Sequence, residues 1–398
     1  PSIGFVAAAV NAGIGAFLLM YFWKQIRGLK WLLVLMLVVS AGGLWYGHIQ
    51  GDTWSKSLTQ GLYDDPIVMS EQTRYQNLVL TRSADSQNPD MRLYINGNLQ
   101  FSSLDEKIYH ENLVHPAMTL APHRNRVLIL GGGDGLAVRE VVKYRDVKSI
   151  TLVDLDPDMI RIASTNKELV RLNGGAFKDA RVTSSLTDAS LRSGVRDSGH
   201  TRPVILTDDS ISEAGGAVKP QRHHAGDVHV YNVDAFKFVN TPQKPYDVVI
   251  VDLPDPNGVE LAKLYSREFY AHIRRLMSPQ GIMVVQSSSP YHSREAYVCI
   301  MKTIRDAGFP VIPYHENVPS FGDWGWTLAW NGTPSQEMQK RINGLDKFPV
   351  KTRYLIDAST WKRTLTFGKG WLDEKGIEVS TLLNPSVMRY YVYRGQDY

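Results

Sequence analysis

The sequence predicts an α/β protein whose main body is a doubly wound parallel sheet, preceded by a small β domain and two transmembrane helices. Three observations support this prediction. Two long apolar stretches occupy the first 50 residues, short apolar segments then alternate with helical patterns, and a glycine-rich turn follows one of those segments. The chain has 398 residues, 43% hydrophobic and 21% charged, which supports a large core and excludes a wholly disordered protein.

The first 50 residues are interpreted as two transmembrane helices at residues 3–23 and 31–49. Each stretch has about the 20 apolar residues that a helix needs to cross roughly 30 Å of hydrocarbon. A signal peptide is the alternative for the first stretch, but it lacks a basic start and a small-residue cleavage site. The chain begins with Pro1, so further helices could precede it.

Residues 62–118 are predicted to form a small N-terminal β domain. Strands are expected at residues 75–82 and 91–101, and Asn96-Gly97 within the second segment is a strong signal for a type I′ hairpin.

Residues 119–330 show the strand–helix alternation of a Rossmann-like domain. Strands are expected at 127–130, 149–153, 228–232, 248–252 and 281–286, and helices at 136–144, 158–172, 267–277 and 294–307.

Two segments depart from this alternation. Residues 183–227 contain no Phe, Trp or Tyr and are predicted to be a disordered insertion. The three histidines there lack spaced acidic or thiolate partners, so we expect no metal site. Residues 331–398 are interpreted as a C-terminal extension that packs on the body without chemistry of its own.

The glycine-rich turn is the first candidate for ligand binding. Gly131, Gly133 and Gly135 follow an apolar strand, and Leu136 occupies the position of the last glycine in the dinucleotide-binding pattern G-x-G-x-x-G. Asp134 would repel a pyrophosphate, so the turn favours an adenosyl-sulfonium ligand of the S-adenosylmethionine type. A tight turn without a ligand is the alternative.

Acidic residues follow the next strands. Asp154 comes about 20 residues after the glycines, where a carboxylate can accept hydrogen bonds from ribose hydroxyls, as it also does in NAD enzymes. Asp156 is interpreted as a helix cap. Asp234 could hold an adenine amino group or cap a helix.

Two further carboxylates, Asp252 and Asp255, end the fourth strand of the body. With Asp134 they predict an acidic pocket that suits two cations, a sulfonium donor and a protonated amine. One carboxylate could then remove the proton of the amine. A purely structural pair of turn aspartates is the alternative.

The charge distribution excludes an obvious nucleic-acid surface. The net charge is +4, and residues 1–60 contribute +3 of it, from four basic residues and Asp52, leaving +1 for the rest. The single cysteine, Cys299, excludes an intramolecular disulfide framework and a zinc site built from several thiolates.

These motifs resemble the spermidine synthases, or polyamine aminopropyltransferases. The resemblance rests on residues 74–76, 105–111, 131–135, 153–156 and 252–256, and it runs from about Tyr63 to Trp330. With the preceding apolar stretches, the chain is similar to the multi-pass membrane branch of that family.

The resemblance implies a role for each matching residue. Asp252 would be the general base, and the diamine would be held by Tyr109, His110, Asp134 and Asp255. Decarboxylated S-adenosylmethionine would be bound as a co-substrate, with no tightly bound cofactor, by Gln76, Asp154, Asp234 and Ala235 together with the glycines. The reaction would give spermidine and 5′-methylthioadenosine and needs no metal. Family members are commonly oligomers, so a homo-oligomer is possible.

Departures from the family pattern leave the amine acceptor open. Leu136, Pro254 and Val259 differ from the usual residues, and the stretch that usually offers a diamine-binding tyrosine has Phe321 and Asp323 instead.

Two other functions stay open: a methyltransferase using S-adenosylmethionine, and a non-catalytic membrane sensor of polyamines or nucleosides. The Asp252/Asp255 pair with Tyr109, His110 and Glu111 favours the aminopropyltransferase, because it predicts an acidic acceptor site.

Membrane orientation is predicted in two opposing ways. The joint between the helices carries Lys24, Arg27 and Lys30, which by the positive-inside rule places the joint in the cytoplasm and the body outside. The donor is a cytosolic metabolite, so we expect a cell-membrane protein with a cytoplasmic catalytic domain.

Overall fold

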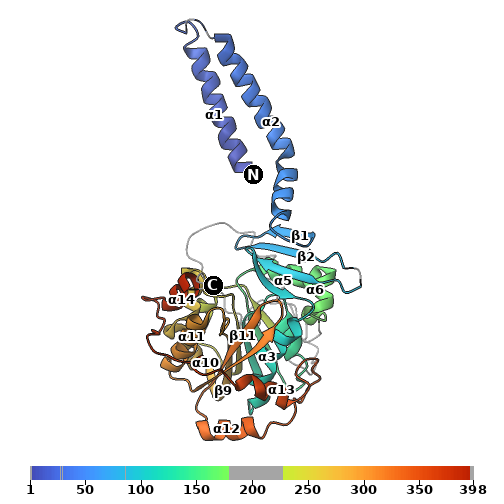
Figure 1. The fold of residues 1–398 in the computed structure, drawn as a ribbon, viewed down its shortest axis with the longest axis vertical. Helices are drawn as coiled ribbons and strands as arrows, with labels where there is room; N and C mark the ends of the chain where they lie inside the picture. Colours follow the sequence, from blue (N-terminus) through green and yellow to red (C-terminus); the bar gives the residue numbers. More distant parts are fainter. Residues whose placement is uncertain (1, 27, 29, 86, 179–226, 395–398) are drawn as a thin grey trace, which may run out of the picture. The chain divides into compact units, whose positions relative to one another are not determined.

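The computed structural model describes residues 2–178 and 227–394, apart from residues 27, 29 and 86 (Figure 1). The predicted insertion at residues 183–227 therefore lies outside the described residues, except for Asp227. The chain divides into two compact units, residues 1–70 with 79–91, and residues 71–78 with 92–398.

The first unit contains the two N-terminal helices. Helix α1 spans Ser2–Tyr21 and α2 spans Lys30–Gln60, and the two pack side by side (Figure 1). Helix α2 continues beyond the predicted end at residue 49 into a polar segment. Among the described residues, Lys30–Gly51 is long and apolar enough to cross a membrane, whereas the apolar segment Val6–Tyr21 is shorter.

Four short strands form a separate sheet with the order β1-β2-β3-β4. Strands β2 (Asn77–Arg82), β3 (Met91–Ile95) and β4 (Asn98–Ser102) match the predicted segments, and β1 (Ile67–Gln72) was not predicted. Strands β3 and β4 are antiparallel, and Asn96 and Gly97 between them have φ values of 51° and 83°. Both angles are positive, as a type I′ turn requires, so the hairpin prediction is confirmed.

The second unit is built on a seven-stranded sheet with the order β10-β11-β9-β8-β5-β6-β7. Its strands are β5 (Arg126–Gly131), β6 (Ser149–Val153), β7 (Asp227–Tyr231), β8 (Tyr246–Asp252), β9 (Met277–Gln286), β10 (Val311–Val318) and β11 (Gly322–Trp330). The first five are parallel, as predicted, but β10 and β11 form an antiparallel edge. The prediction of a wholly parallel sheet was therefore wrong, because a hairpin extends the sheet without a crossover helix.

The strand order reverses between β5 and β8, since β6 and β7 lie on one side and β9 on the other. A ligand crevice of an open α/β sheet lies at such a reversal, outside the carboxyl ends of the strands. In the parallel register Gly131 of β5 faces Asp252 of β8, so the predicted glycine turn and the predicted general base meet there.

Helices of the second unit cover the sheet and pack around it (Figure 1). They are α3 (Glu106–Leu120), α4 (Leu136–Val141), α5 (Pro157–Thr165), α6 (Lys167–Leu172), α8 (Ala235–Val239), α9 (Val259–Ala262), α10 (Arg267–Leu276), α11 (Arg294–Asp306), α12 (Ser335–Asn343), α13 (Ala358–Lys362) and α14 (Ser386–Arg394), with short 3₁₀ turns at 176–178, 263–265 and 363–365. The predicted helix at 158–172 is divided at Asn166, whose side chain accepts hydrogen bonds from Glu168 and Leu169 and begins a new helix.

The core lies between the central strands and the helices. Val248, Val249, Ile250 and Val251 of β8 are all fully buried, as expected for a strand covered on both faces. The C-terminal extension joins the same core through Ile377 and Val387.

We predict that Leu128→Ala destabilises the protein strongly. Leu128 lies in β5 and is 0% exposed, so truncation leaves a cavity in the middle of the sheet. Substitutions of this type cost about 2–5 kcal/mol of unfolding free energy. Thermal unfolding of the full chain in detergent measures the loss. Leu383→Ala is the matched control, since Leu383 is 98% exposed, and an equal loss in both variants would contradict the assigned core.

Candidate active site

The glycine turn after β5 is packed too tightly for any other residue. Gly131 has a φ of +83°, and a Cβ atom there would lie 2.0 Å from the backbone oxygen of Asp252. A Cβ atom on Gly133 would lie 2.5 Å from Oδ2 of Asp154, and one on Gly135 would lie 2.6 Å from the ring of Phe177. The glycines therefore let the turn approach both predicted site carboxylates.

Asp154 is held against this turn by two backbone donors. Its Oδ2 accepts a hydrogen bond from the amide of Gly133 at 3.0 Å, and its Oδ1 accepts one from Asp156 at 2.9 Å. Burial raises the pKa of Asp154 to about 6, although these two hydrogen bonds oppose the shift.

The turn that carries Gln76 is fastened beside Asp154. The amide of Gln76 donates to the hydroxyl of Thr73, and that hydroxyl lies 2.7 Å from Oδ2 of Asp156. Asp156 also accepts a hydrogen bond from Asp158, so its predicted role as a helix cap is confirmed. Gln76 and Asp154 thus occupy neighbouring turns, although 78 positions separate them in sequence.

Asp234 caps helix α8, which begins at Ala235. Its Oδ1 accepts a hydrogen bond from the amide of Lys237 at 3.1 Å, and its Oδ2 pairs with the ammonium of Lys263 at 2.8 Å. Burial opposes ionisation, but Lys263 and the backbone donors lower the pKa of Asp234. The helix-cap interpretation is therefore confirmed, and contact with adenine stays a prediction.

Asp252 ends strand β8 and is bonded to a tyrosine from helix α3. The hydroxyl of Tyr109 donates to Oδ1 of Asp252 at 2.7 Å. Tyr109 is 8% exposed and packs against the rings of Phe321 and Trp326. Burial and the nearby charge of Asp134 raise the pKa of Asp252 to about 6, whereas His110 and Tyr109 oppose the shift. A carboxylate with that pKa is suited to accept a proton near neutral pH.

The imidazole of His110 is fixed by the buried ion pair of Glu106 and Arg139. Its Nδ1 lies 2.8 Å from the backbone oxygen and 3.1 Å from Oε2 of Glu106. The Glu106 carboxylate receives two N–H groups of Arg139, at 2.9 and 2.8 Å. Burial lowers the pKa of His110, but the carboxylates of Glu106, Asp134 and Asp252 more than offset that effect and raise it. The neighbouring carboxylates therefore favour the protonated form of His110.

Asp134 belongs to the same electrostatic cluster. Its Oδ1 accepts a hydrogen bond from the amide of Leu136 at 2.9 Å. Burial raises the pKa of Asp134, whereas His110 lowers it. The structure thus brings Asp134, Asp252 and His110 into mutual electrostatic contact, as the sequence predicted.

Asp255 is held by residues that the sequence analysis missed. Its Oδ1 accepts a hydrogen bond from Nε2 of Gln286 at 3.1 Å, and its Oδ2 accepts one from the hydroxyl of Tyr391 at 3.0 Å. Tyr391 lies in α14, so the C-terminal extension contacts a predicted site residue. Burial raises the pKa of Asp255.

The structure also corrects the role of Glu111, which was counted with the acidic acceptor site. Its carboxylate accepts backbone hydrogen bonds from Arg353, Tyr354 and Leu355, at 2.7, 2.8 and 2.9 Å. Helical periodicity explains the error, because Glu111 leaves the helix in a different direction from Tyr109 and His110.

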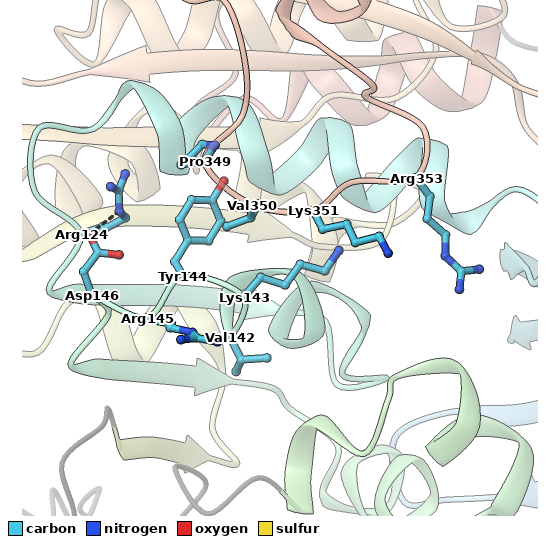
Figure 2. A pocket seen from close by; sticks show the side chains of 10 residues that line it. All are labelled: Arg124, Val142, Lys143, Tyr144, Arg145, Asp146, Pro349, Val350, Lys351 and Arg353. Carbon is cyan, nitrogen blue, oxygen red and sulfur yellow. Dashed lines mark hydrogen bonds and ion pairs between the residues drawn. The ribbon is translucent and has the colours of Figure 1, made fainter.

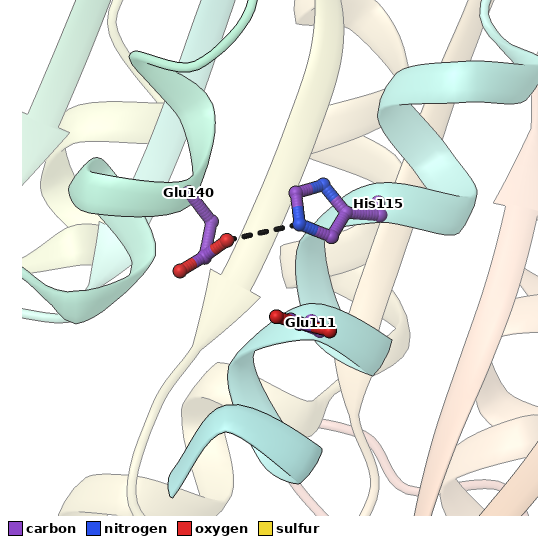
Figure 3. Close-up of side chains that lie close together, drawn as sticks. All are labelled: Glu111, His115 and Glu140. Atoms are coloured by element: carbon purple, nitrogen blue, oxygen red, sulfur yellow. Dashed lines mark hydrogen bonds and ion pairs between the residues drawn. The ribbon is translucent and has the colours of Figure 1, made fainter. Parts of the chain in front are cut away.

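Glu111, His115 and Glu140 lie close enough together to resemble a metal site (Figure 3). Their ligand atoms are already engaged. Nε2 of His115 lies 2.9 Å from Glu140, its Nδ1 lies 3.0 Å from the hydroxyl of Tyr144, and Glu140 also pairs with Arg139. We therefore interpret the group as a buried hydrogen-bond network that joins helices α3 and α4.

A cavity of about 1150 Å³ lies beside this network, with Tyr144 and Arg353 in its lining (Figure 2). Its lining is mainly basic and consists of Arg124, Val142, Lys143, Tyr144, Arg145, Asp146, Pro349, Val350, Lys351 and Arg353. The predicted site residues are not among its lining residues. Its positive charge makes it an unsuitable place for an amine.

Only some of the missed residues left a signal in the sequence. Glu106 falls within the motif at 105–111, and Gln286 ends a predicted strand at the same sheet edge as Asp252. Arg139 and Tyr391 follow no such pattern. Asp323, which was considered for the acceptor site, instead pairs with His315 at 2.7 Å.

Comparison with known proteins shows the family of this chain. Residues 106–218 and 220–340 match the model of the spermine/spermidine synthase domain. The chain is 38% identical to polyamine aminopropyltransferase 1 of Streptomyces coelicolor, over 99% of this chain and 64% of that protein. It is 34% identical to a polyamine aminopropyltransferase of Oceanobacillus iheyensis, over 99% of this chain and 66% of that protein.

A third relative, polyamine aminopropyltransferase 2 of Aquifex aeolicus, is 33% identical over 100% of this chain and 68% of its own length. The chain therefore spans about two thirds of the length of these relatives.

Solved structures show the same fold. A spermidine synthase crystallised with the transition-state analogue AdoDATO superimposes with a TM-score of 0.58 at 20% identity, over 77% of this chain and 88% of that one. The spermidine synthase of Thermotoga maritima gives a TM-score of 0.56 at 21% identity, over 77% and 87% of the two chains.

We predict that Glu106→Gln weakens the protein and flattens its response to acid. Burial opposes ionisation, but His110 and Arg139 hold the pKa of Glu106 well below its usual value. A lowered folded-state pKa gives stability that is present above the unfolded pKa of about 4.3 and is lost as the pH falls below it. Breaking a buried pair of this kind costs about 3–5 kcal/mol.

Chemical unfolding of the full chain between pH 3 and 7 measures both effects. Glu337→Gln is the control, because Glu337 pairs with Arg341 on the surface and should contribute at most about 0.5 kcal/mol. A loss in the Glu106 variant no larger than in the control would contradict the role of the buried pair.

Proposed function

Because this chain belongs to the spermine/spermidine synthase family, we propose that it is an aminopropyltransferase. It would transfer the aminopropyl group of decarboxylated S-adenosylmethionine to a diamine such as putrescine, giving spermidine and 5′-methylthioadenosine. The activity of the whole protein is part of this proposal, because the chain spans about two thirds of the length of its curated relatives.

The observation that carries this proposal is the acidic cluster at the carboxyl edge of the sheet. Asp134, Asp252 and Asp255 come from two strands that meet at the reversal of strand order, and burial raises the pKa of each. Such a cluster attracts cations, and both a sulfonium and an ammonium group are cations. A neutral methyl acceptor would gain no electrostatic stabilisation from this cluster.

The donor would lie against the glycine turn. Gly131 and Gly133 carry no Cβ atom that would collide with Asp252 or Asp154, and Asp154 would accept hydrogen bonds from the ribose hydroxyls of the donor. Gln76, Asp234 and Ala235 come from turns around the same end of the sheet. The pKa of about 6 for Asp154 keeps it ionised at neutral pH, as that role requires.

The reaction would proceed by direct displacement. Asp252 takes a proton from the terminal ammonium of the diamine, which frees a lone pair on nitrogen. That lone pair forms a bond to the aminopropyl carbon next to sulfur, and the carbon–sulfur bond breaks with its electrons returning to sulfur. The thioether therefore leaves uncharged. Holding two substrates in line supplies much of the acceleration.

Tyr109 and Asp255 would position the diamine for this step. The hydroxyl of Tyr109 fixes the carboxylate of Asp252 at 2.7 Å, so the base has one orientation before substrate binds. Asp255 lies three residues further along and would bind the second ammonium group. His110, held by Glu106, limits the repulsion between Asp134 and Asp252.

We predict that the purified full chain releases methylthioadenosine from decarboxylated S-adenosylmethionine and putrescine, and that Asp252→Asn lowers kcat by at least about 100-fold, in line with general-base catalysis. Activity should fall as the pH drops through about 6, because Asp252 then becomes protonated. Asp306→Asn is a control, since Asp306 pairs on the surface with Arg267.

Mass spectrometry of the products across a panel of amines identifies the acceptor. A methylated product from S-adenosylmethionine would support a methyltransferase. Tight polyamine binding without turnover would support the sensor. Full activity of the Asp252 variant would refute its role as the base.

We also propose that α1 and α2 anchor the chain in the cell membrane with the catalytic unit in the cytoplasm. Large apolar side chains on both helices are exposed, among them Phe17 at 61%, Trp31 at 76% and Val38 at 61%. Lipid would cover these surfaces. The cytosolic donor favours a cytoplasmic catalytic unit, whereas the basic joint at residues 24–30 favours the opposite orientation.

Cysteine labelling should place Gln25 outside and Leu383 inside. Both residues are exposed, and the single native thiol, Cys299, is buried and gives little background. In intact cells a membrane-impermeant maleimide should modify Gln25→Cys, and should modify Leu383→Cys only after lysis. The reverse pattern would overturn the cytoplasmic placement.

Light scattering of the detergent-solubilised chain tests the proposed homo-oligomer.

A further inference from the structure

The C-terminal extension is bound by several hydrogen bonds to the rest of the catalytic unit, which is the second of the two compact units. Lys302 of α11 donates to the backbone oxygen of Ile377 at 2.7 Å. The backbone amide of Arg267 in α10 donates to the backbone oxygen of Ser380 at 2.9 Å. Arg389 of α14 pairs with Glu378 at 2.6 Å. Val387 at the start of α14 is 0% exposed. Helix α14 therefore has a fixed position on the body.

One residue of this helix reaches the predicted acceptor site. Tyr391 packs against the core between the sheet and α11, and its hydroxyl donates to Oδ2 of Asp255 at 3.0 Å. The two residues are 136 positions apart in sequence. Tyr393, two positions later on the same helix, is 70% exposed and offers a direct comparison.

We propose that Tyr391 is a positioning residue that keeps Asp255 oriented to bind the distal ammonium group of the acceptor amine. This inference rests on the proposed aminopropyl transfer. Tyr391 and Gln286 each occupy one oxygen of Asp255, and a carboxylate oxygen can accept a second hydrogen bond. The carboxylate is thus held in one orientation and still has capacity for an ammonium group.

The hydrogen bond also affects the ionisation of Asp255. Burial raises the pKa of Asp255, and the donors Gln286, Tyr391 and Ser288 oppose that increase. The titratable groups that interact with Asp255 come from three elements of the catalytic unit: Tyr109, Tyr265 and Tyr391. Tyr109 and Tyr265 also interact with Asp252. All three tyrosines are neutral at working pH, because burial raises the pKa of each.

Tyr391→Phe removes the donor and keeps the ring that packs in the core. The pKa of Asp255 should rise, so a larger fraction of it is protonated and unable to bind an ammonium group at low pH. We expect the acidic limb of kcat/KM for putrescine to move upward by about one pH unit, the size expected for losing a hydrogen bond to a charged group. KM on the acidic limb, where Asp255 is partly protonated, should rise by up to about tenfold, while kcat at saturating amine changes less than about twofold.

The experiment compares the full-length wild type, Tyr391→Phe and Tyr393→Phe between pH 5 and 9 at saturating donor. Tyr393→Phe should match the wild type. Calorimetric titration of putrescine into each protein with methylthioadenosine present gives a second readout that needs no turnover, and there too the affinity of the Tyr391 variant should fall by up to about tenfold on the acidic limb.

An unchanged pH profile and unchanged putrescine affinity in Tyr391→Phe would overturn the inference. A drop in kcat at constant KM would also overturn it, because that result indicates a role in the chemical step or a distorted fold. If the wild type binds putrescine but forms no product, the proposed aminopropyl transfer fails, and the calorimetric comparison still decides the role of Tyr391.

Discussion

The burial of three carboxylates at one edge of the sheet is the constraint on which the site depends. Asp134, Asp252 and Asp255 lose much of their hydration there, and ionised groups without water or partners are costly. Part of this cost is offset by a chain of polar contacts, in which the guanidinium of Arg139 binds the carboxylate of Glu106 and that carboxylate binds the imidazole of His110. Burial, together with the nearby charge of Asp134, raises the pKa of Asp252 to about 6, and two bound cations would relieve the remaining excess of negative charge.

Backbone geometry makes this clustering possible. The parallel register places Gly131 directly opposite Asp252, and a side chain at Gly131 would collide with the backbone oxygen of Asp252. Gly133 stands in the same relation to the carboxylate of Asp154. Asp154 and Asp252 therefore both approach this turn closely, because Gly131 and Gly133 have no side chains that would keep them away.

Sequence patterns predicted the parts of the structure in which spacing determines position. Apolar segments ending in Gly131, Asp154 and Asp252 indicated parallel strands, and the carboxyl ends of parallel strands meet at one sheet edge. The hairpin of β10 and β11 and the break at Asn166 were missed, because each depends on local capping and pairing rather than on hydrophobic period. The Glu106–Arg139 pair and the contact of Tyr391 with Asp255 join residues 33 and 136 positions apart, and nothing in either local sequence marks its partner.

The two halves of the proposed site therefore differ in how well the sequence predicts them. The donor half is built from turns that directly follow strands, so the fold itself sets its geometry. The acceptor half depends on Asp255, which is held by Gln286 from β9 and by Tyr391 from a helix beyond the sheet. A segment outside the sheet can change in length or sequence without disturbing the strands. Variation in the C-terminal extension would therefore alter which amine is accepted while leaving the donor site and the base in place.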